Sequence, residues 1–436
     1  MRDFVSIPKI DAAIRFFIYL LIFWLPYSPA VVESCVSIGL ALWIIKRIIW
    51  LWGMRKNPPR DGQDWLKIAR DLFVPSSFLN KPIGIFLIAC VFSVVGSISV
   101  AHAFSSLFTK TLEWFIIYFL VLEVFQEKKY IHTAFVVFVF TALSTCLDSL
   151  WQFHVTHRDI FLGHQIASDG RANAGFKHSN DLAGYLLFVI PFLMFYFLRD
   201  QKKKIWKLIL LGISLWSIVL TFSRGAWIGL LLGFLFSLMI LLRKKWIALT
   251  IWGVLIGLMG TLILSSSDLR HKMRLDQGEF LGSMLWRTGL WADTLRMIYE
   301  RPFFGHGVNT YMQLSQQYRR KNSEGASYNP SYAHNCYLQI AAEAGTIGLI
   351  AFLGIIFILF NRSLRSLRSQ RSTDDFGVLL QGILVGIFCF LTHSFMDTNF
   401  YSLQLSAWFW VMTGIYVAGF KILNGSGNHD IKLISV

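Results

Sequence analysis

The residues best suited to chemistry lie in and around a polar segment of about 80 residues, Ser265 to Gly348, which separates two hydrophobic parts of the chain. His334 stands near its end, where a hydrophobic run begins. This position predicts a histidine at the start of a helix, where the helix dipole disfavours an imidazolium and leaves a neutral ring able to accept a proton. A histidine bonded to a backbone carbonyl would have the same sequence pattern.

Arg224 is the second candidate, because it stands between two hydrophobic runs with almost no loop to hold it in water. Placing an arginine deep in a membrane helix costs on the order of 2.5–3.5 kcal/mol. Its side chain could extend to the lipid head groups, or it could face a cavity and bind an anion. Gly225, which keeps the turn beside it open, favours the cavity.

Arg287 lies in the stretch from Met284 to Tyr299, where hydrophobic residues follow helical spacing on a mixed face. This pattern predicts a helix lying at a membrane surface. Its guanidinium could face lipid phosphates, or it could join Arg224 on one diphosphate. Arginine suits the second task, because its planar fork makes bidentate and permanently charged hydrogen bonds to phosphate oxygens.

Further basic residues could assist at a phosphate. They are Arg171, Lys177, His178 and Arg301. The histidines at positions 154, 157, 164 and 178 match no metal-binding helix motif, and no carboxylates cluster with them, so we expect no metal.

Three other features of the polar segment and the late runs have structural interpretations. Glu343 falls within the helix after His334 and is expected to have a buried partner. Gly345 and Gly348 are expected to let a neighbouring helix approach. Asp397, in a short gap between two late runs, fits a structural role.

The composition is that of a membrane protein. Hydrophobic residues make up 55% of the chain and charged residues only 15%, against about 25% in soluble proteins. The net charge of +16 falls mainly in short loops between apolar runs, which is an orientation signal rather than a nucleic-acid site. The five cysteines form no CxxC pair, so neither a disulfide framework nor a zinc site is expected.

Twelve apolar runs are each about long enough to span a bilayer, which takes about 20 residues. They must be helical, because lipid offers no partner to backbone N–H and C=O groups. Transmembrane strands would show alternation instead. The runs are 12–27, 34–52, 83–103, 108–126, 131–150, 180–198, 206–222, 225–242, 246–264, 335–360, 377–394 and 400–420.

Lysine and arginine fill every second gap between these runs, as in Lys202-Lys203-Lys204 and Arg243-Lys244-Lys245. The positive-inside rule places those gaps, and both termini, in the cytoplasm. The predicted layout has nine transmembrane helices over 1–264, with an outer loop near 151–180. A long outer loop over 265–334, three helices over 335–420 and a cytoplasmic tail over 421–436 complete it.

Three motifs in this order resemble the O-antigen ligase and polymerase family, over roughly 150–420. The first is Ser223-Arg224-Gly225, and the second combines Arg287 with Pro302 and Gly305-His306-Gly307. The third is His334-Asn335, followed by nine residues and Gly345-x-x-Gly348, which is similar to the ligase signature.

The resemblance implies an all-α, GT-C-like glycosyltransferase with about 12 transmembrane helices and a long periplasmic loop with short helices, in the bacterial inner membrane. Such enzymes move a glycan from undecaprenyl diphosphate to the lipid A-core on the periplasmic face, with inversion and without metal, ATP or another cofactor. By position, Arg224 and Arg287 would hold the donor diphosphate and His334 would be the general base. The other basic residues named above would assist.

Other interpretations stay open at this point. A polymerase joining lipid-linked repeat units shares the fold and the donor, and transfer onto protein is a third possibility within the family. A glycolipid transporter or flippase would place charges along the whole depth of the bundle and show inverted repeats, whereas the candidate residues here gather on one side. A purely structural membrane protein leaves Arg224 unexplained.

Overall fold

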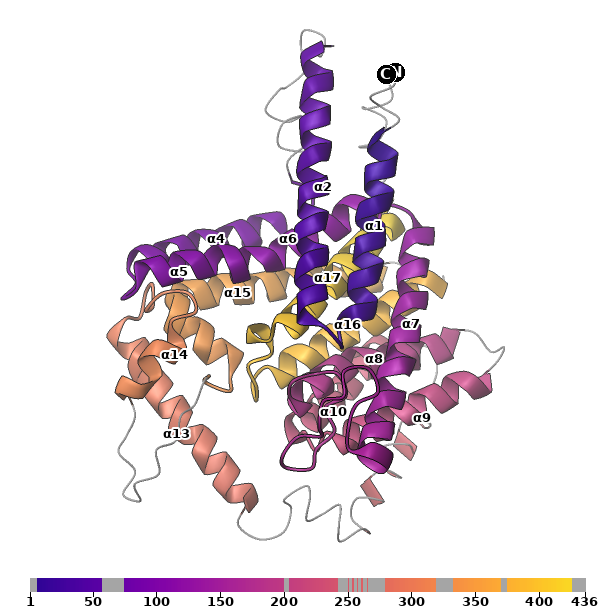
Figure 1. The fold of residues 1–436 in the computed structure, drawn as a ribbon. Helices are drawn as coiled ribbons and strands as arrows, with labels where there is room; N and C mark the ends of the chain where they lie inside the picture. Colours follow the sequence, from indigo (N-terminus) through magenta and orange to yellow (C-terminus); the bar gives the residue numbers. More distant parts are fainter. Residues whose placement is uncertain are drawn as a thin grey trace.

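The computed structural model describes residues 6–56, 74–199, 204–241, 279–318, 332–369 and 375–425, together with isolated positions between 250 and 265. Over these residues the chain is a bundle of helices (Figure 1). The described ranges contain no strand, and one isolated bridge pairs Arg158 with Gln165. The all-α prediction is confirmed for this part of the protein.

The first half of the chain forms α1 (Ser6–Trp24), α2 (Pro29–Lys56), α4 (Asn80–Val95), α5 (Val100–Ser106), η2 (Leu107–Thr111), α6 (Leu112–Val124), α7 (Lys128–Trp151), η3 (Gln152–Thr156), α8 (Ser179–Arg199) and α9 (Lys204–Leu220). The second half forms α10 (Arg224–Leu241), α13 (Glu279–Glu300), α14 (Tyr311–Leu314), η4 (Ser315–Tyr318), α15 (Cys336–Ser369), α16 (Asp375–His393), η5 (Asn399–Tyr401) and α17 (Leu403–Leu423). Most predicted apolar runs coincide with helix, but the run 83–103 is divided between α4 and α5 by non-helical residues 96–99. The run 246–264 is the other exception. That run lies mostly outside the described residues, as do the charged stretch 243–245 and the tail from 426.

Six of the described helices are long and apolar enough to cross a membrane. They start at Pro29, Lys128, Ser179, Cys336, Asp375 and Leu403. Two shorter apolar helices, Asn80–Val95 and Arg224–Ile240, accompany them. The composition and the helix lengths are therefore those of a multi-pass membrane protein. The total of about twelve spans stays a prediction.

Glycines bring three of these helices into close contact. On α10, Gly225, Gly229 and Gly233 repeat every fourth residue, and a Cβ at Gly229 would lie 3.0 Å from the carbonyl oxygen of Cys389 on α16. On α16 itself, a Cβ at Gly386 would lie 3.0 Å from Phe188 of α8. In lipid, helices associate through such close packing rather than through the hydrophobic effect. α16 is thereby held between α8 and α10.

A break in α15 corrects the expectation for the glycine pair. Gly345 adopts φ 74° and ψ 177°, which interrupts the helix, and a Cβ there would overlap the carbonyl of Phe303. The neighbour that it admits is a loop, since Thr346 N and Oγ1 donate to Pro302 O at 2.7 and 2.8 Å. Gly348 admits no neighbouring helix either, because a Cβ there would meet only Ala344 of its own helix.

The predicted surface helix from Met284 to Tyr299 forms most of α13, which packs against α15. Figure 1 shows α13 and α14 beside the N-terminal part of α15. The segment before α8 is bonded to the end of α9, just before α10, where Ala172 N donates to Leu220 O at 2.9 Å. The start of α15, the end of α16 and the start of α10 are thus covered by two polar segments.

Candidate functional site

His334 lies in a short turn that the next residues hold in place. It precedes the helix, with a left-handed φ of 49°, rather than opening it as the sequence suggested. Asn335 caps α15, because its Oδ1 accepts from the backbone N–H groups of Tyr337 and Leu338 at 3.0 and 3.1 Å. A left-handed non-glycine residue costs on the order of 1–3 kcal/mol and is found at functional sites. The cap explains why asparagine follows the histidine.

The imidazole of His334 is oriented by a carboxylate. Its Nδ1 lies 3.2 Å from Oδ1 of Asp397, and its ring centre lies 5.1 Å from that of Trp286 on α13. An ionised carboxylate can only accept, so Nδ1 carries the proton and Nε2 presents its lone pair. The partner is therefore a side chain of another segment and not a backbone carbonyl.

Asp397 is 8% exposed and has polar contacts on both oxygens. Its Oδ1 also accepts from Thr398 N at 2.8 Å, and its Oδ2 accepts from the amide of Asn180. Burial opposes ionisation of Asp397, but the hydrogen bond from His334 and the electrostatic influence of the His334 and His393 rings outweigh burial and keep its pKa below the usual range. Asp397 is a built-in counter-charge for a protonated His334.

Arg171 continues this chain of contacts one step further. Its Nη2 donates to Oδ1 of Asn180 at 2.7 Å, and its Nε donates to Thr221 O at 2.6 Å. Because Asn180 accepts from Arg171 through its oxygen, its NH₂ group points at Asp397. The residues Arg171, Asn180, Asp397 and His334 thus form one hydrogen-bonded series. Arg171, which we expected to assist at a phosphate, orients the amide that holds Asp397.

His393 is a buried residue beside this series that sequence reasoning did not single out. Its Nε2 lies 3.4 Å from Ser223 Oγ, and its Nδ1 lies 3.0 Å from the amide of Asn399. The charges of Arg171 and Arg287 act on this ring. A histidine that ends a hydrophobic run, with an asparagine six residues later, is the signal that could have drawn attention to it.

The two candidate phosphate-binding arginines belong to elements that border these histidines. Arg224 is the half-buried first residue of α10. A Cβ at the next residue, Gly225, would lie 3.1 Å from the His393 ring. Arg287 follows Trp286, which packs on His334, and its buried Nε has no hydrogen-bond partner among the described residues. Two elements far apart in the sequence, α10 and α13, therefore both border the histidines.

The remaining basic candidates have different surroundings. His178 interacts with the charges of Asp397 and His334, and partial burial together with the charge of Lys177 lowers its pKa. Arg301 is further removed, since its Nη1 donates to Gly96 O at the end of α4 at 2.6 Å. Lys177 and His178 thus border the His334 region, whereas Arg301 fastens the loop after α13 to α4.

The described residues contain no group of three His, Cys, Asp or Glu side chains that could hold a metal ion. The histidines of the segment 151–180 include two with separate partners: His154 accepts from Trp216 Nε1 at 3.3 Å, and His164 lies 3.7 Å from Asp159. What the arrangement offers is one oriented imidazole, one buried carboxylate and nearby guanidinium groups.

Comparison with known proteins gives two matches. Residues 209–353 match the O-antigen ligase family model, a range that includes Arg224, Arg287 and His334 but ends before Asp397. A protein of Haemophilus influenzae, described as uncharacterised, is 24% identical over 173 residues. That alignment takes in 37% of this chain and 43% of the relative, so the chain matches less than half of that protein's length.

Proposed function

The chain is a multi-pass membrane protein of the O-antigen ligase family, and from this premise we propose that it transfers a glycan from undecaprenyl diphosphate to the lipid A-core at the periplasmic face of the bacterial inner membrane. The observation that carries the proposal is the His334–Asp397 pair. It is supported by Trp286, which precedes Arg287 and packs on His334, and by Gly225, which follows Arg224 and lies against His393. A general base next to fixed positive charge is what an inverting transfer from a diphosphate requires.

On the donor side, Arg224 and Arg287 bind the diphosphate oxygens. As the bond between the anomeric carbon and the phosphate oxygen breaks, negative charge grows on the leaving diphosphate. Two guanidinium groups fixed at that position stabilise the transition state more than the ground state. The two arginine side chains thus stabilise the leaving diphosphate.

On the acceptor side, Nε2 of His334 takes the proton of an acceptor hydroxyl as its oxygen attacks the anomeric carbon. The new glycosidic bond forms on the face opposite to the breaking bond, so the configuration inverts. The proton stays on His334 until solvent takes it, and the carboxylate of Asp397 stabilises the imidazolium meanwhile. General-base catalysis of this kind contributes about 10²–10⁴-fold.

The decisive experiment uses purified protein in detergent with lipid-linked glycan, EDTA and either lipid A-core or a second lipid-linked repeat as acceptor. We expect product on lipid A-core with the wild type, unaffected by EDTA, and a loss on the order of 10²-fold or more in His334→Ala. Product on the lipid-linked repeat would make the enzyme a polymerase. Full transfer by a well-folded His334→Ala protein would exclude the assigned base.

A further inference from the structure

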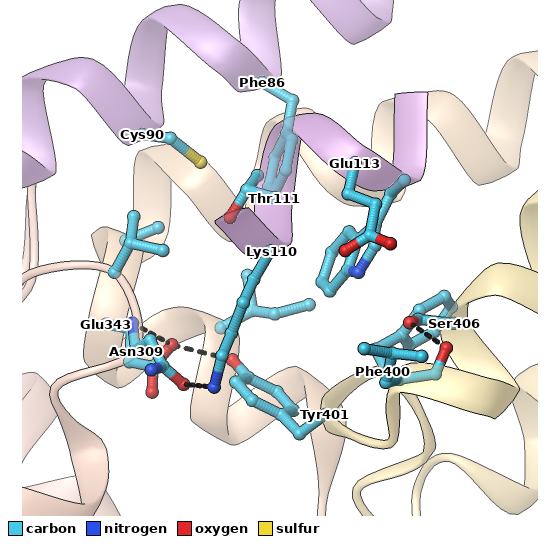
Figure 2. A pocket seen from close by; sticks show the side chains of 15 residues that line it. Phe86, Cys90, Lys110, Thr111, Glu113, Asn309, Glu343, Phe400, Tyr401 and Ser406 are labelled. Carbon is cyan, nitrogen blue, oxygen red and sulfur yellow. Dashed lines mark hydrogen bonds between the residues drawn. The ribbon is translucent and has the colours of Figure 1, made fainter. Parts of the chain in front are cut away.

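A cavity of about 180 Å³ lies between α4, the η2 turn, α6, the loop at Val308–Asn309, the start of α15 and the start of α17. Figure 2 shows the residues that line it. None of the arginines discussed above is among them. The cavity is thus a second site, and neither the donor contacts nor the general base account for it.

The cavity combines an aromatic lining with a polar mouth. Its aromatic residues are Phe86, Trp114, Phe400 and Tyr401. At the mouth stand Lys110, Glu113 and Asn309, and Lys110 Nζ lies 3.5 Å from Oδ1 of Asn309 (Figure 2). Sites for small polar molecules have this form, in which apolar walls fill the volume and a few polar groups fix the orientation.

Glu343 shapes the cavity and does not have spare hydrogen-bonding capacity. Its carboxylate accepts from Asn309 N and Tyr401 Oη at 2.9 Å each, and it accepts from Tyr311 N and the Gln339 amide at 3.3 Å each. This is the buried partner set that the sequence led us to expect. The contacts fasten the 309–311 segment and Tyr401 to α15, so they hold the cavity walls in position.

Glu113 is the polar group available to a ligand. It is half-buried at the mouth, and its carboxylate has no hydrogen-bond partner among the described residues. Asn309, by contrast, is fixed, because its backbone N–H donates to Glu343 and its amide donates to Ser106 Oγ at 3.2 Å. The carboxylate of Glu113 lies apart from the Lys110–Asn309 pair (Figure 2), so polar groups at two places in the cavity can accept from and donate to hydroxyl groups.

Two tyrosines connect the cavity to the general base. The ring of Tyr401 in the cavity wall lies 5.7 Å from that of Tyr332, which is two residues before His334. Other neighbours lie between His334 and the donor-side arginines. Trp286, which contacts His334, precedes Arg287, and the loop that carries Asp397 lies beside Gly225, which follows Arg224. A ligand in the cavity would therefore reach His334 from the side of Tyr332.

We propose that this cavity binds one sugar ring of the acceptor, with the aromatic residues against its C–H faces and Lys110, Glu113 and Asn309 on its hydroxyls. The volume fits a single ring, since an engineered cavity of about 150 Å³ takes benzene. The proposal rests on the proposed function, because it assigns the acceptor to the His334 side opposite the donor diphosphate.

The first test is steady-state transfer by Glu113→Gln and Lys110→Ala, with Glu127→Gln as a control that changes the same charge at an exposed residue outside the cavity. We expect KM for lipid A-core to rise about tenfold or more, as loss of a hydrogen bond to a charged group implies. In both variants, KM for the lipid-linked donor should stay at the wild-type value. The control variant should keep the wild-type KM for both substrates. A rise in the donor KM instead, or no change in either, would overturn the assignment.

The second test measures binding without chemistry, using deacylated lipid A-core oligosaccharide and calorimetry on the detergent-solubilised protein. Wild type and His334→Ala should bind alike, whereas Glu113→Gln should bind about tenfold more weakly. Binding of this kind without any transfer would leave the cavity assignment in place and remove the proposed function. If transfer occurs but Glu113→Gln binds the oligosaccharide as tightly as the wild type, the proposed function stands and the cavity assignment is overturned. If neither binding nor transfer is seen, both proposals are overturned.

Discussion

Asp397 decides which nitrogen of His334 can take a proton. Because its carboxylate accepts from Nδ1 at 3.2 Å, the lone pair lies on Nε2. Asn180 and Thr398 donate to the same carboxylate, which fixes its orientation. In this respect Asp397 is a positioning residue, since it acts through His334 and does not touch the acceptor.

Replacing Asp397 with asparagine is the sharpest test at this scale. An amide can donate to Nδ1, which would leave the proton on Nε2 and remove the base. We expect kcat to fall on the order of 10²-fold or more, with little change in KM for donor or acceptor. Asp375→Asn, an exposed aspartate paired with Arg199 at 3.4 Å, should keep wild-type kcat. An Asp397→Asn enzyme with full kcat would show that His334 does not depend on this contact.

At the scale of the elements, the break in α15 connects the two polar regions. The loop at Pro302–Val308 enters the break, and its backbone bonds to both sides of it. His306 N and Gly307 N donate to Ala342 O and Glu343 O at 3.0 Å each, while Thr346 N donates to Pro302 O. The helix carbonyls that the break leaves open are thereby satisfied by the loop. The same loop then supplies Asn309 to the cavity.

Gly345→Ala should separate the loop from the helix. A Cβ would overlap the carbonyl of Phe303, and the φ of 74° is unfavourable for alanine. We expect a lower melting temperature, on the order of 1–3 kcal/mol of lost stability, and reduced transfer. Gly354→Ala in the same helix meets no neighbour within 4 Å and should be neutral or stabilising. Equal melting temperatures for the two variants would contradict this role of the break.

At the scale of the whole molecule, two groups of charged residues have different partners. One group joins α1, α2 and α6, where Lys46 Nζ lies 2.6 Å from both Asp11 and Glu123, and Arg47 lies 2.7 Å from Glu123. These charges neutralise one another and hold the first helices together. The other group is the series from Arg171 to His334. Charged residues that lie in separate groups and pair within each group fit an enzyme better than a transporter, in which charges would line a path through the bundle.

The orientation of the molecule can be tested by fusion of alkaline phosphatase, which is active only outside the cytoplasm. A fusion after Ala326, in the predicted outer loop, should be active, because the lysine- and arginine-rich gaps place that loop in the periplasm. A fusion after Ser369, at the end of α15 and within the predicted cytoplasmic gap 361–375, should be inactive. The opposite pair of results would invert the orientation and move His334 to the cytoplasmic side.

The sequence by itself determined the helical class, the membrane setting and most helix positions. Composition and run length suffice for these, since a long apolar run in lipid has to be a helix. The arginine and histidine motifs also pointed to the family whose model matches residues 209–353. A charged or titratable residue beside an apolar run costs free energy in a membrane, so it stands out in the sequence alone.

Only the tertiary structure decided which residues act together. Nothing in the spacing links His334 with Asp397, Asn180 and Arg171, because the four come from three segments that meet only when α8, α15 and α16 pack. The break at Gly345 was equally hidden, since a glycine pair in an apolar helix looks the same whether it admits a helix or a loop. Hydrophobic periodicity describes one helix at a time, whereas hydrogen bonds between distant segments depend on how the helices are placed.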